Sequence, residues 1–264
     1  MVLCNLQFIS LKDGISVGSF LSKLRQHGIK PVVQARVIRW MILPTRISIG
    51  HLLGRNIHWD LLLILGENDS IPREAQLDID ATWTASSGVS SKVISNYATT
   101  NAELLLPPPG SVRAPDRHTV EPSKTSQNLE MSPELDEWIT ALPTPLKEQP
   151  VSMLNLLAFN PGKKDQYKKY GTEFSARVGS KHGGRVKIVG RVVGGQARED
   201  GWEEIAFVHY PSVRHFASMA ASKDYQEVNH KYRLGALKDT FICCVMEVDD
   251  NGNIAHLHPA KEKL

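Results

Sequence analysis

The chain has 264 residues, of which 41% are hydrophobic and 22% charged, close to the usage of ordinary globular domains. Lys and Arg number 31 against 28 Asp and Glu, so the formal net charge is +3, and at about 150 residues per domain the length suits two domains. The apolar runs at 61–65 and 241–246 are too short to span a bilayer. Three cysteines, two of them adjacent, exclude a disulfide scaffold. Residues 1–7 lack a basic start and an unbroken apolar run, so we expect no signal peptide and a reducing, cytoplasmic location.

The first hundred residues contain a strand pattern, a helix pattern and further strand patterns. Alternation predicts a strand over 2–10, and apolar residues at helical spacing predict a helix over 16–27 that ends at Gly28. Residues 31–42, rich in Val and Ile, and residues 57–65 predict two more strands. We expect residues 72–97 to be mostly helical, with a break at 86–88, and a short last strand over 102–106.

A proline-rich segment follows, over 107–149. Residues 111–130 are polar and lack apolar periodicity, which is typical of a mobile linker. Ser132 followed by Pro133 is a helix start signal, and apolar residues at helical spacing predict a short helix that ends before Pro143.

The remaining residues repeat the same alternation of elements. Strands are predicted over 151–159, 185–193, 202–210 and 241–248. A helix over 163–181 places Tyr167, Tyr170 and Phe174 on one face and ends before Gly183 and Gly184. Residues 211–236 are predicted to be helical with a break near Ser222.

The two halves can be aligned with each other. His27-Gly28 matches His182-Gly183, and eight residues later Ala35-Arg36-Val37-Ile38 matches Gly190-Arg191-Val192-Val193. Asn5 corresponds to Asn155 in the first strand of each half, and Trp59-Asp60 to Trp202-Glu203 in the third. Their common order predicts a duplicated β-α-β-β-α-β unit. The open sheet face of one such unit must be covered, and two units can cover each other by closing into a barrel.

Several segments of the second half resemble the ferredoxin-like dimeric α+β barrel superfamily, in particular its small domains of unknown function. They are Val151-Ser-Met-Leu-Asn-Leu-Leu, the His182-Gly-Gly turn, the strand from Trp202 to Ser212, and Ser222-Lys-Asp-Tyr-Gln with Arg233. The resemblance covers residues 150–250 well and the first half poorly. It implies an α+β fold of two ferredoxin-like (βαββαβ) units that form an intrachain pseudo-dimeric α+β barrel. We therefore expect units at 1–106 and 150–250, the segment 107–149 between them, and a tail at 251–264.

The same resemblance implies a range of chemistries without a shared catalytic motif. Members include cofactor-independent monooxygenases, polyketide cyclases, isomerases, decarboxylases and haem-handling proteins. We expect a cofactor-independent enzyme that acts on a small aromatic or polyketide-like molecule in secondary or catabolic metabolism. The alternative is a non-catalytic barrel that binds a small molecule.

Strand alternation sorts the side chains of each strand into two faces. With Leu6, Phe8, Ile205 and Phe207 assigned to the helix side, the barrel side receives a set of polar and aromatic residues: Asn5, Gln7, Gln34, Arg36, Trp40, Trp59, Asn155, Lys187, Val189, Arg191, Trp202, Glu204 and Tyr210. One interpretation is an internal network in which Arg36 or Arg191 pairs with Glu204 or Asp60. The other is a ligand cavity walled by tryptophans, in which an arginine binds a carboxylate or stabilises an enolate. Under the second interpretation Arg36 is predicted to matter more for binding than Arg191.

His58, at the mouth of a strand, and Tyr210 are the candidates for acid and base catalysis. His27 and His182 close helices, where an imidazolium complements the helix dipole, and His209 has the parity of a buried structural histidine. His256 and His258 lie in the predicted tail without neighbouring ligand residues, so no metal site is expected. Gly194-Gly195 joins two strands and does not fit a phosphate-binding loop, so we expect no cofactor.

RNA binding is a weaker alternative, because the RNA-recognition motif has the same element order. Residues 206–210 match the end of its third-strand signature, but Glu203-Glu204-Ile205 replaces the basic-Gly-aromatic start. Lysines 163, 164, 168 and 169 fit a solvated helix face. The expected partner is therefore a small molecule, with neither nucleic acid nor membrane, and self-association into a homo-oligomer stays open.

Overall fold

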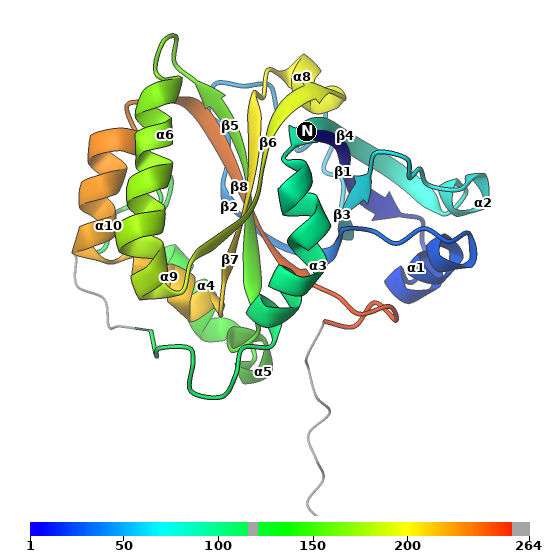
Figure 1. Ribbon diagram of the computed structural model, residues 1–264, viewed down its shortest axis with the longest axis horizontal. Helices are drawn as coiled ribbons and strands as arrows, with labels where there is room; N and C mark the ends of the chain where they lie inside the picture. The colour runs from blue at the N-terminus through cyan, green and yellow to red at the C-terminus, as the bar shows by residue number, and fades with distance from the viewer. Residues whose placement is uncertain (116–120, 255–264) are drawn as a thin grey trace, which may run out of the picture.

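Antiparallel strands close into a barrel in the order β1-β3-β2-β8-β5-β7-β6-β4 (Figure 1). The structure is a computed structural model and describes residues 1–115 and 121–254. The first half supplies β1 (Val2–Leu11), β2 (Val33–Ile42), β3 (Leu61–Gly66) and β4 (Ile79–Val89). The second supplies β5 (Val151–Phe159), β6 (Arg185–Gly194), β7 (Glu204–Tyr210) and β8 (Leu237–Glu247). The prediction of an α+β barrel is confirmed.

Each half contributes its strands in the same spatial order. Around the barrel they run β4-β1-β3-β2 and then β8-β5-β7-β6. The halves meet where β2 pairs with β8 and where β4 pairs with β6. Because both seams are hydrogen-bonded, the described strands leave no free sheet edge.

The elements of the second half agree with the sequence. One continuous helical run comprises α6 (Lys164–Glu173), the π-helical turn η1 (Phe174–Gly179) and α7 (Ser180–His182). It ends at Gly183, whose φ of 73° favours glycine. The later helical region is broken at Ser222 as predicted: α9 (Val213–Ala220) is followed by α10 (Lys223–Val228), capped by the Ser222 side chain, and by η2 (Asn229–Arg233). A short helix not foreseen, α8 (Gln196–Asp200), joins β6 to β7.

The end of the first half corrects the sequence prediction. Helix α1 (Val17–Gln26) forms as expected, with Ser16 as its N-cap. The expected helix over 72–97 is limited to α2 (Arg73–Gln76), and most of that segment is the strand β4. Helix α3 (Ser91–Leu105) occupies the place of the predicted last strand. In β4, Trp83, Ala85, Ser87 and Val89 are buried at alternate positions, a period of two that the intervening Thr and Ser residues obscure.

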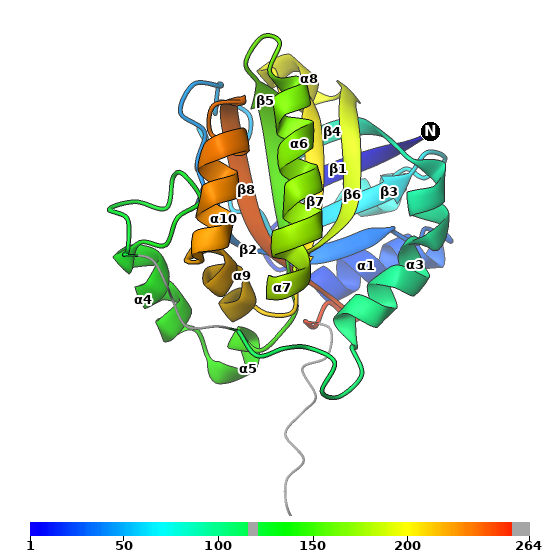
Figure 2. The same ribbon diagram turned by 60° about the vertical axis from the view of Figure 1, so that its left-hand side comes forward.

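Helices cover the two halves unequally (Figures 1 and 2). On the first half, α1 packs Val17, Phe20, Leu21 and Leu24 against the outer face of β1 and β3. On the second half, the α6–α7 run and the helices from α9 to η2 both lie on the outer face. From the connecting segment, α4 (Pro133–Ala141), as well as Leu129 and Met131, packs onto the second half. Helix α5 (Thr144–Lys147) leads into β5.

The barrel interior is filled by apolar side chains from every strand, including Leu6, Phe8, Leu154, Phe207 and Phe241. The predicted facing of β1, β5 and β7 is therefore wrong, because Leu6, Phe8, Leu154 and Phe207 were assigned to the helix side. The interior of a closed barrel is drier than a partly covered outer face, so the apolar side chains point inward. Because side chains alternate along a strand, a shift of one residue in the assignment moves every apolar side chain from one face to the other.

One end of the barrel is aromatic and is closed by the loop after β2. Trp59 donates from Nε1 to the Leu52 carbonyl oxygen at 2.8 Å, and Trp83 donates to Asp200 Oδ2 at 3.0 Å. The Asp239 carboxylate accepts backbone N–H groups of Thr45 to Ile47 at 2.6–3.1 Å. These contacts fix the loop over the aromatic end.

No helix in the described ranges has both the length and the hydropathy needed to cross a bilayer. Residues 249–253 form a turn in which the Asp249 N–H donates to the Asn253 carbonyl oxygen at 2.8 Å. His118, His256 and His258, together with most of the predicted tail, lie outside the described residues.

Candidate functional site

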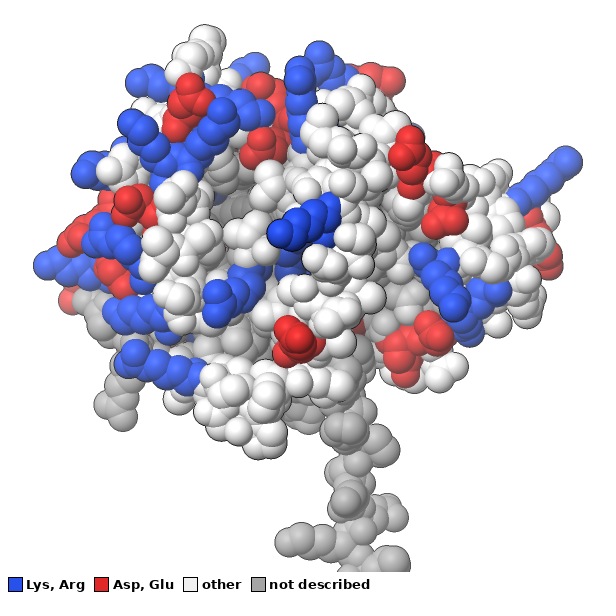
Figure 3. Space-filling model, viewed as in Figure 1, with Lys and Arg blue, Asp and Glu red and all other residues white. Residues whose placement is uncertain are grey.

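A cavity of about 410 Å³ lies outside the barrel, between the α6–η1 run and the outer face of the second-half sheet. Figure 3 shows its mouth as a hollow between the lysine-rich surface over α6 and the strand β6. The lining is mostly apolar and aromatic, and the described lining residues are Leu129, Met153, Asn155, Tyr167, Lys168, Tyr170, Gly171, Thr172, Phe174, Ser175, Val186, Val189, Glu204, Ala206, Val208, Tyr210, Phe216 and Ile242.

The helix wall of the cavity is an aromatic row. Tyr167, Tyr170 and Phe174 share one helix face, and consecutive ring centroids lie 5.2 and 6.0 Å apart. Phe174 begins the π-helical turn, an element found often at functional sites. The sheet wall opposite carries smaller side chains, among them Ala206 and Val208 of β7. Large rings on one side and small side chains on the other leave the space open.

Buried tyrosine hydroxyl groups gather at this site. Burial raises the pKa of Tyr167, Tyr170, Tyr210 and Tyr225, so each hydroxyl keeps its proton at neutral pH. Tyr170 Oη lies 3.4 Å from Tyr225 Oη. The cavity therefore offers phenolic donors within an apolar wall.

Behind these rings lies a buried cation, Arg233. Its side chain is 1% exposed, and its positive charge opposes the rise in pKa of all four tyrosines. Nη1 donates to Asn229 Oδ1 at 3.5 Å, and Nη2 has no hydrogen-bond partner among the described residues. A guanidinium stays protonated in proteins, and a buried charge requires compensation. The arrangement suits a ligand or intermediate that carries negative charge on an oxygen near the phenols.

Charged side chains stand at the mouth of the cavity. Glu204 Oε2 is 3.0 Å from Lys164 Nζ, and the Glu204 side chain is 16% exposed. Deeper in, the Asn155 amide nitrogen donates to the carbonyl oxygens of Met153 and Ala206 at 3.0 and 3.3 Å. A carboxylate at the entrance and an amide in the sheet wall add polar groups to the apolar lining.

The predicted site residues separate into three groups. Asn155 and Tyr210, with Glu204, come together in the cavity, although on the outer face of the sheet. Trp59 and Trp202 belong to the barrel-interior cluster, and Trp40 packs against it with its ring 5.3 Å from that of Phe241. The tryptophans do face inward as predicted, but they fill the interior. The residues of the third group do not line the cavity, although Arg191 is the register partner of Glu204 across β6 and β7. This group comprises Asn5, Gln7, Gln34, Arg36, His58 and Arg191.

The residues of the third group lie on the outer surface, contrary to prediction. Asn5 and Gln7 line a surface depression beside Thr82 of β4. Gln34 Nε2 donates to the Val248 carbonyl oxygen at 3.1 Å, and Arg36 Nε to that of Gly252, also at 3.1 Å.

The predicted internal ion pairs do not form either. Arg191 is exposed on β6, and Glu204 pairs with Lys164 instead. His58 is 87% exposed and lies 3.5 Å from Asp60. The arginines therefore neither enter the barrel nor neutralise its interior.

Sequence reasoning missed Tyr167, Tyr170 and Arg233 as functional candidates. The tyrosine spacing was read only as a helix face, and Arg233 only as part of the family-like segment. The signal that could have found the tyrosines is chemical, because tyrosines with polar hydroxyls recur on a helix face predicted to be buried. Arg233 lies in a polar segment and carries no such signal.

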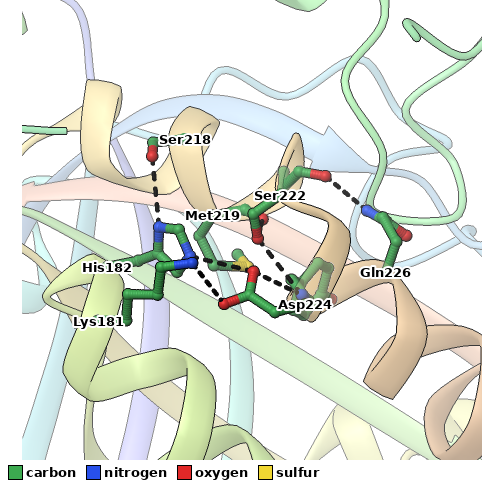
Figure 4. A network of polar contacts seen from close by, with 9 residues as sticks. Lys181, His182, Ser218, Met219, Ser222, Asp224 and Gln226 are labelled. Carbon is green, nitrogen blue, oxygen red and sulfur yellow. Dashed lines mark hydrogen bonds and ion pairs between the residues drawn. The ribbon is translucent and has the colours of Figure 1, made fainter. Parts of the chain in front are cut away.

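A polar network holds the helices around the cavity (Figure 4). His182 at the end of α7 contacts Ser218 Oγ of α9 at 3.3 Å and Asp224 Oδ1 of α10 at 3.4 Å. Lys181 Nζ reaches the other carboxylate oxygen of Asp224 at 3.0 Å. Although burial works against ionisation of Asp224, hydrogen bonds from Ser222 and Lys181 prevail and lower its pKa to about 2. The network ties the two helical runs together at one end of the cavity.

Among the described residues, no group of three or more His, Cys, Asp or Glu side chains is arranged to hold a metal ion. Cys243 and Cys244 are buried free thiols, and burial raises the pKa of both.

Comparison with known proteins gives similarity to solved structures. No family model and no curated protein matches the sequence. The chain is 26% identical to the RPA0582 protein of unknown function from Rhodopseudomonas palustris, over 44% of this chain and 93% of that one, with a TM-score of 0.35. A monooxygenase-like protein from Lactobacillus acidophilus is 7% identical over 94% of each chain, with a TM-score of 0.47. An anthrone oxidase-like protein is 9% identical over 94% of this chain and 92% of its own, with a TM-score of 0.41.

Proposed function

We propose that the cavity under α6 binds a small aromatic or polyketide-like molecule and that the protein converts it without a cofactor. The observation that carries the proposal is a 410 Å³ aromatic cavity lined by protonated tyrosines, with the buried cation Arg233 behind them, whose Nη2 has no hydrogen-bond partner among the described residues. Such a cavity suits flat, mostly apolar ligands with a few polar groups.

The polar groups fit chemistry through an enolate or phenolate. The hydroxyls of Tyr210 and Tyr167 donate to the ligand oxygen on which negative charge develops, and the charge of Arg233 stabilises that state through the phenols. Glu204 at the mouth accepts a proton from the ligand carbon. This assignment replaces His58 by Glu204 as the base and retains Tyr210 as the acid. Cyclisation, isomerisation, decarboxylation and oxygenation all pass through such a carbanion-like state.

We also infer that each half is a ferredoxin-like unit, with boundaries at 1–106 and 150–250 and the connecting segment 107–149 between them. Their common strand order supports this interpretation. In this view the second unit carries the active cavity, and the first completes the barrel.

Native mass spectrometry of the full chain purified from cells tests the cavity. We expect a retained small molecule that Ala206→Phe removes, because Ala206 lines the cavity from β7. Val193→Phe is the matched control, because Val193 is 51% exposed elsewhere on the barrel. If Ala206→Phe fails to fold, Gly171→Leu fills the same space, since a Cβ there meets nothing within 4 Å. Retention of the ligand by folded cavity-filling variants would refute the site.

Turnover separates the enzyme from the alternative, a non-catalytic binding barrel. The ligand identified by mass spectrometry, or a chemically reduced precursor of it, is incubated separately with the wild-type protein and with the Glu204→Gln variant. Products are followed by liquid chromatography. Product formation that Glu204→Gln abolishes supports catalysis. Saturable binding without product supports the binding barrel.

A further inference from the structure

The end of the barrel opposite the tryptophans is polar and charged. Ser152, Lys187, His209 and Glu247, one from each strand of the second half, lie buried in one layer there. Lys187 Nζ contacts Glu247 Oε1 and lies 3.3 Å from Ser152 Oγ. The side chains of Lys187 and Glu247 are only 1% and 9% exposed. Helix α3, which crosses beside β6 in Figure 1, covers this layer.

A second cavity, of about 260 Å³, lies between α3 and β6 and reaches Lys187. Tyr97 and Asn101 line it from the helix, with Lys92 and Asn96 towards its mouth. Asn101 Nδ2 donates to Glu247 Oε2 at 2.6 Å, and the centre of the Tyr97 ring is 5.4 Å from Lys187 Nζ. The helix therefore supplies a phenol and an amide to the ion pair.

Three buried polar atoms in this region have no partner among the described residues: Tyr97 Oη, Asn101 Oδ1 and His209 Nδ1. Buried polar groups in native proteins are nearly always hydrogen-bonded. A pair that only sealed the barrel end would need neither a cavity nor these unpartnered groups. Two of these atoms belong to residues that line the second cavity, Tyr97 and Asn101, and this points to a polar molecule that enters it.

The surroundings of Lys187 make its ammonium proton easier to remove. Burial lowers the pKa of Lys187, although Glu247 opposes the shift. Burial, with a smaller contribution from Glu247, raises the pKa of Tyr97, so its hydroxyl keeps its proton. Burial and the nearby Lys187, His215 and Arg185 lower the pKa of His209 to about 3, so that imidazole is neutral. A buried lysine beside a proton acceptor is an arrangement that activates amines as nucleophiles.

We propose that this barrel end is a second reactive site, in which Lys187 condenses with a small aldehyde or ketone to form an imine. The ammonium proton of Lys187 passes to Glu247, and the free Nζ lone pair attacks the carbonyl carbon. Tyr97 Oη donates a proton to the carbonyl oxygen, and the resulting phenolate takes a proton back from the attacking nitrogen, which gives a neutral carbinolamine and restores the phenol. The protonated Glu247 then donates its proton to the hydroxyl group, which leaves as water, so the products are the protonated imine and one water molecule. The step needs no oxidant or reductant.

Access to Lys187 depends on α3. Of the fifteen residues of this helix, all of them described, Tyr97 is the one that is buried. Val93 and Ile94 also pack against the barrel, but they are only partly buried. A helix with one fully buried side chain opens more readily than the barrel beneath it. A small carbonyl compound then reaches the amine without unfolding the sheet.

Reductive trapping tests the proposal. The full chain is incubated with acetaldehyde or with pyruvate, treated with sodium borohydride, and digested for peptide mass spectrometry. We expect a stable secondary amine at Lys187, formed faster than at Lys92, because a lowered pKa increases the fraction of neutral amine at a given pH. Lys92 is exposed at the same cavity and serves as the internal reference.

Variants separate reaction at this site from general lysine labelling. Asn96→Trp obstructs the cavity mouth and is expected to slow labelling of Lys187, whereas Ser95→Trp, on the exposed surface of the same helix, leaves it unchanged. Glu247→Gln removes the proton acceptor and is expected to shift the pH profile of labelling. Labelling of Lys187 no faster than Lys92 in the folded wild-type protein would overturn the proposal, even if every variant failed to fold.

Discussion

The two halves of the barrel share a strand order but differ in what lies on their outer faces. Between its third and fourth strands the second half inserts α9, α10 and η2, whereas the first half inserts the four-residue helix α2. The second-half sheet is therefore covered by two helical runs, and the first-half sheet mainly by α1. The cavity under α6 lies on the side that carries two helical runs.

This difference shows how the two halves of a duplicated fold can take different roles, one structural and one in ligand binding. Two helical runs over a sheet leave an enclosed space between them, which a ligand can occupy away from water. On the first half, part of the outer face is polar, and Ser86 Oγ donates to Asn5 Oδ1 at 2.9 Å. Both halves contribute to the packed interior, so the first half supports the barrel while the second is free to carry a site.

The largest expected effect on stability distinguishes the two faces of β1, one toward the barrel interior and one toward the outer surface. Phe8→Ala removes a fully buried ring that contacts Trp40, Trp59, Trp83 and Phe241. We expect a loss of about 4 kcal/mol in the free energy of unfolding, typical for a buried phenylalanine. Gln7→Ala, the next residue along β1, should change it by less than about 0.5 kcal/mol. Urea denaturation measures both, and similar losses would contradict the assigned facing of β1.

How well the sequence predicted each half depended on local signals. Helices 164–182 and 213–233 have clear apolar faces and defined stops at Gly183 and Ser222, so their placement was right. The strand β4 was missed because Thr82, Thr84 and Ser86 occupy its outward positions and Arg73 to Gln76 begin as a helix. Local sequence cannot reveal that β4 pairs with β6 of the other half, the contact that fixes it as a strand.

The site was predictable only in part, for a geometric reason. Asn155 and Tyr210 were predicted as site residues because they alternate with the apolar residues of their strands. In the structure they do lie on the opposite face of the sheet from those residues. Which face is the interior depends on how well helices cover the outside, and that is a tertiary property. Arg233 could not be placed from sequence, since its neighbours Tyr167 and Tyr225 come from different helices.

Arginines in the two halves provide the next test. Arg233→Met removes the cation behind the tyrosines, and loss of a charge-assisted stabilisation should weaken ligand binding by about 2 kcal/mol, roughly thirtyfold. Arg36→Met, and likewise Arg191→Met, should leave binding unchanged because neither residue lines the cavity. Isothermal titration with the retained ligand measures all three. Equal loss with Arg36→Met would show that the ligand does not bind in the cavity under α6.

The smallest expected effect compares the histidines that correspond in the internal repeat. His27 and His182 each lie near a carboxylate, at 3.2 Å from Glu74 and 3.4 Å from Asp224, but the first pair is exposed and the second largely buried. Because the pKa of Asp224 falls from 3.8 to about 2 on folding, ionised Asp224 stabilises the fold by up to about 2 kcal/mol above pH 4. That contribution is lost as the pH falls from 3.8 towards 2, where the unfolded and then the folded carboxylate take up protons.

Asp224→Asn should therefore lower the free energy of unfolding by about 1–2 kcal/mol at pH 7 and by progressively less towards pH 2. Glu74→Gln should change it by less than about 0.5 kcal/mol at any pH, because exposed ion pairs contribute little. Chemical denaturation across this pH range measures both variants against the wild type. A pH-independent loss for Asp224→Asn would mean that packing, and not the charge, links α7 to α10, and equal losses for the two variants would remove the distinction between a covered and an exposed half at this position.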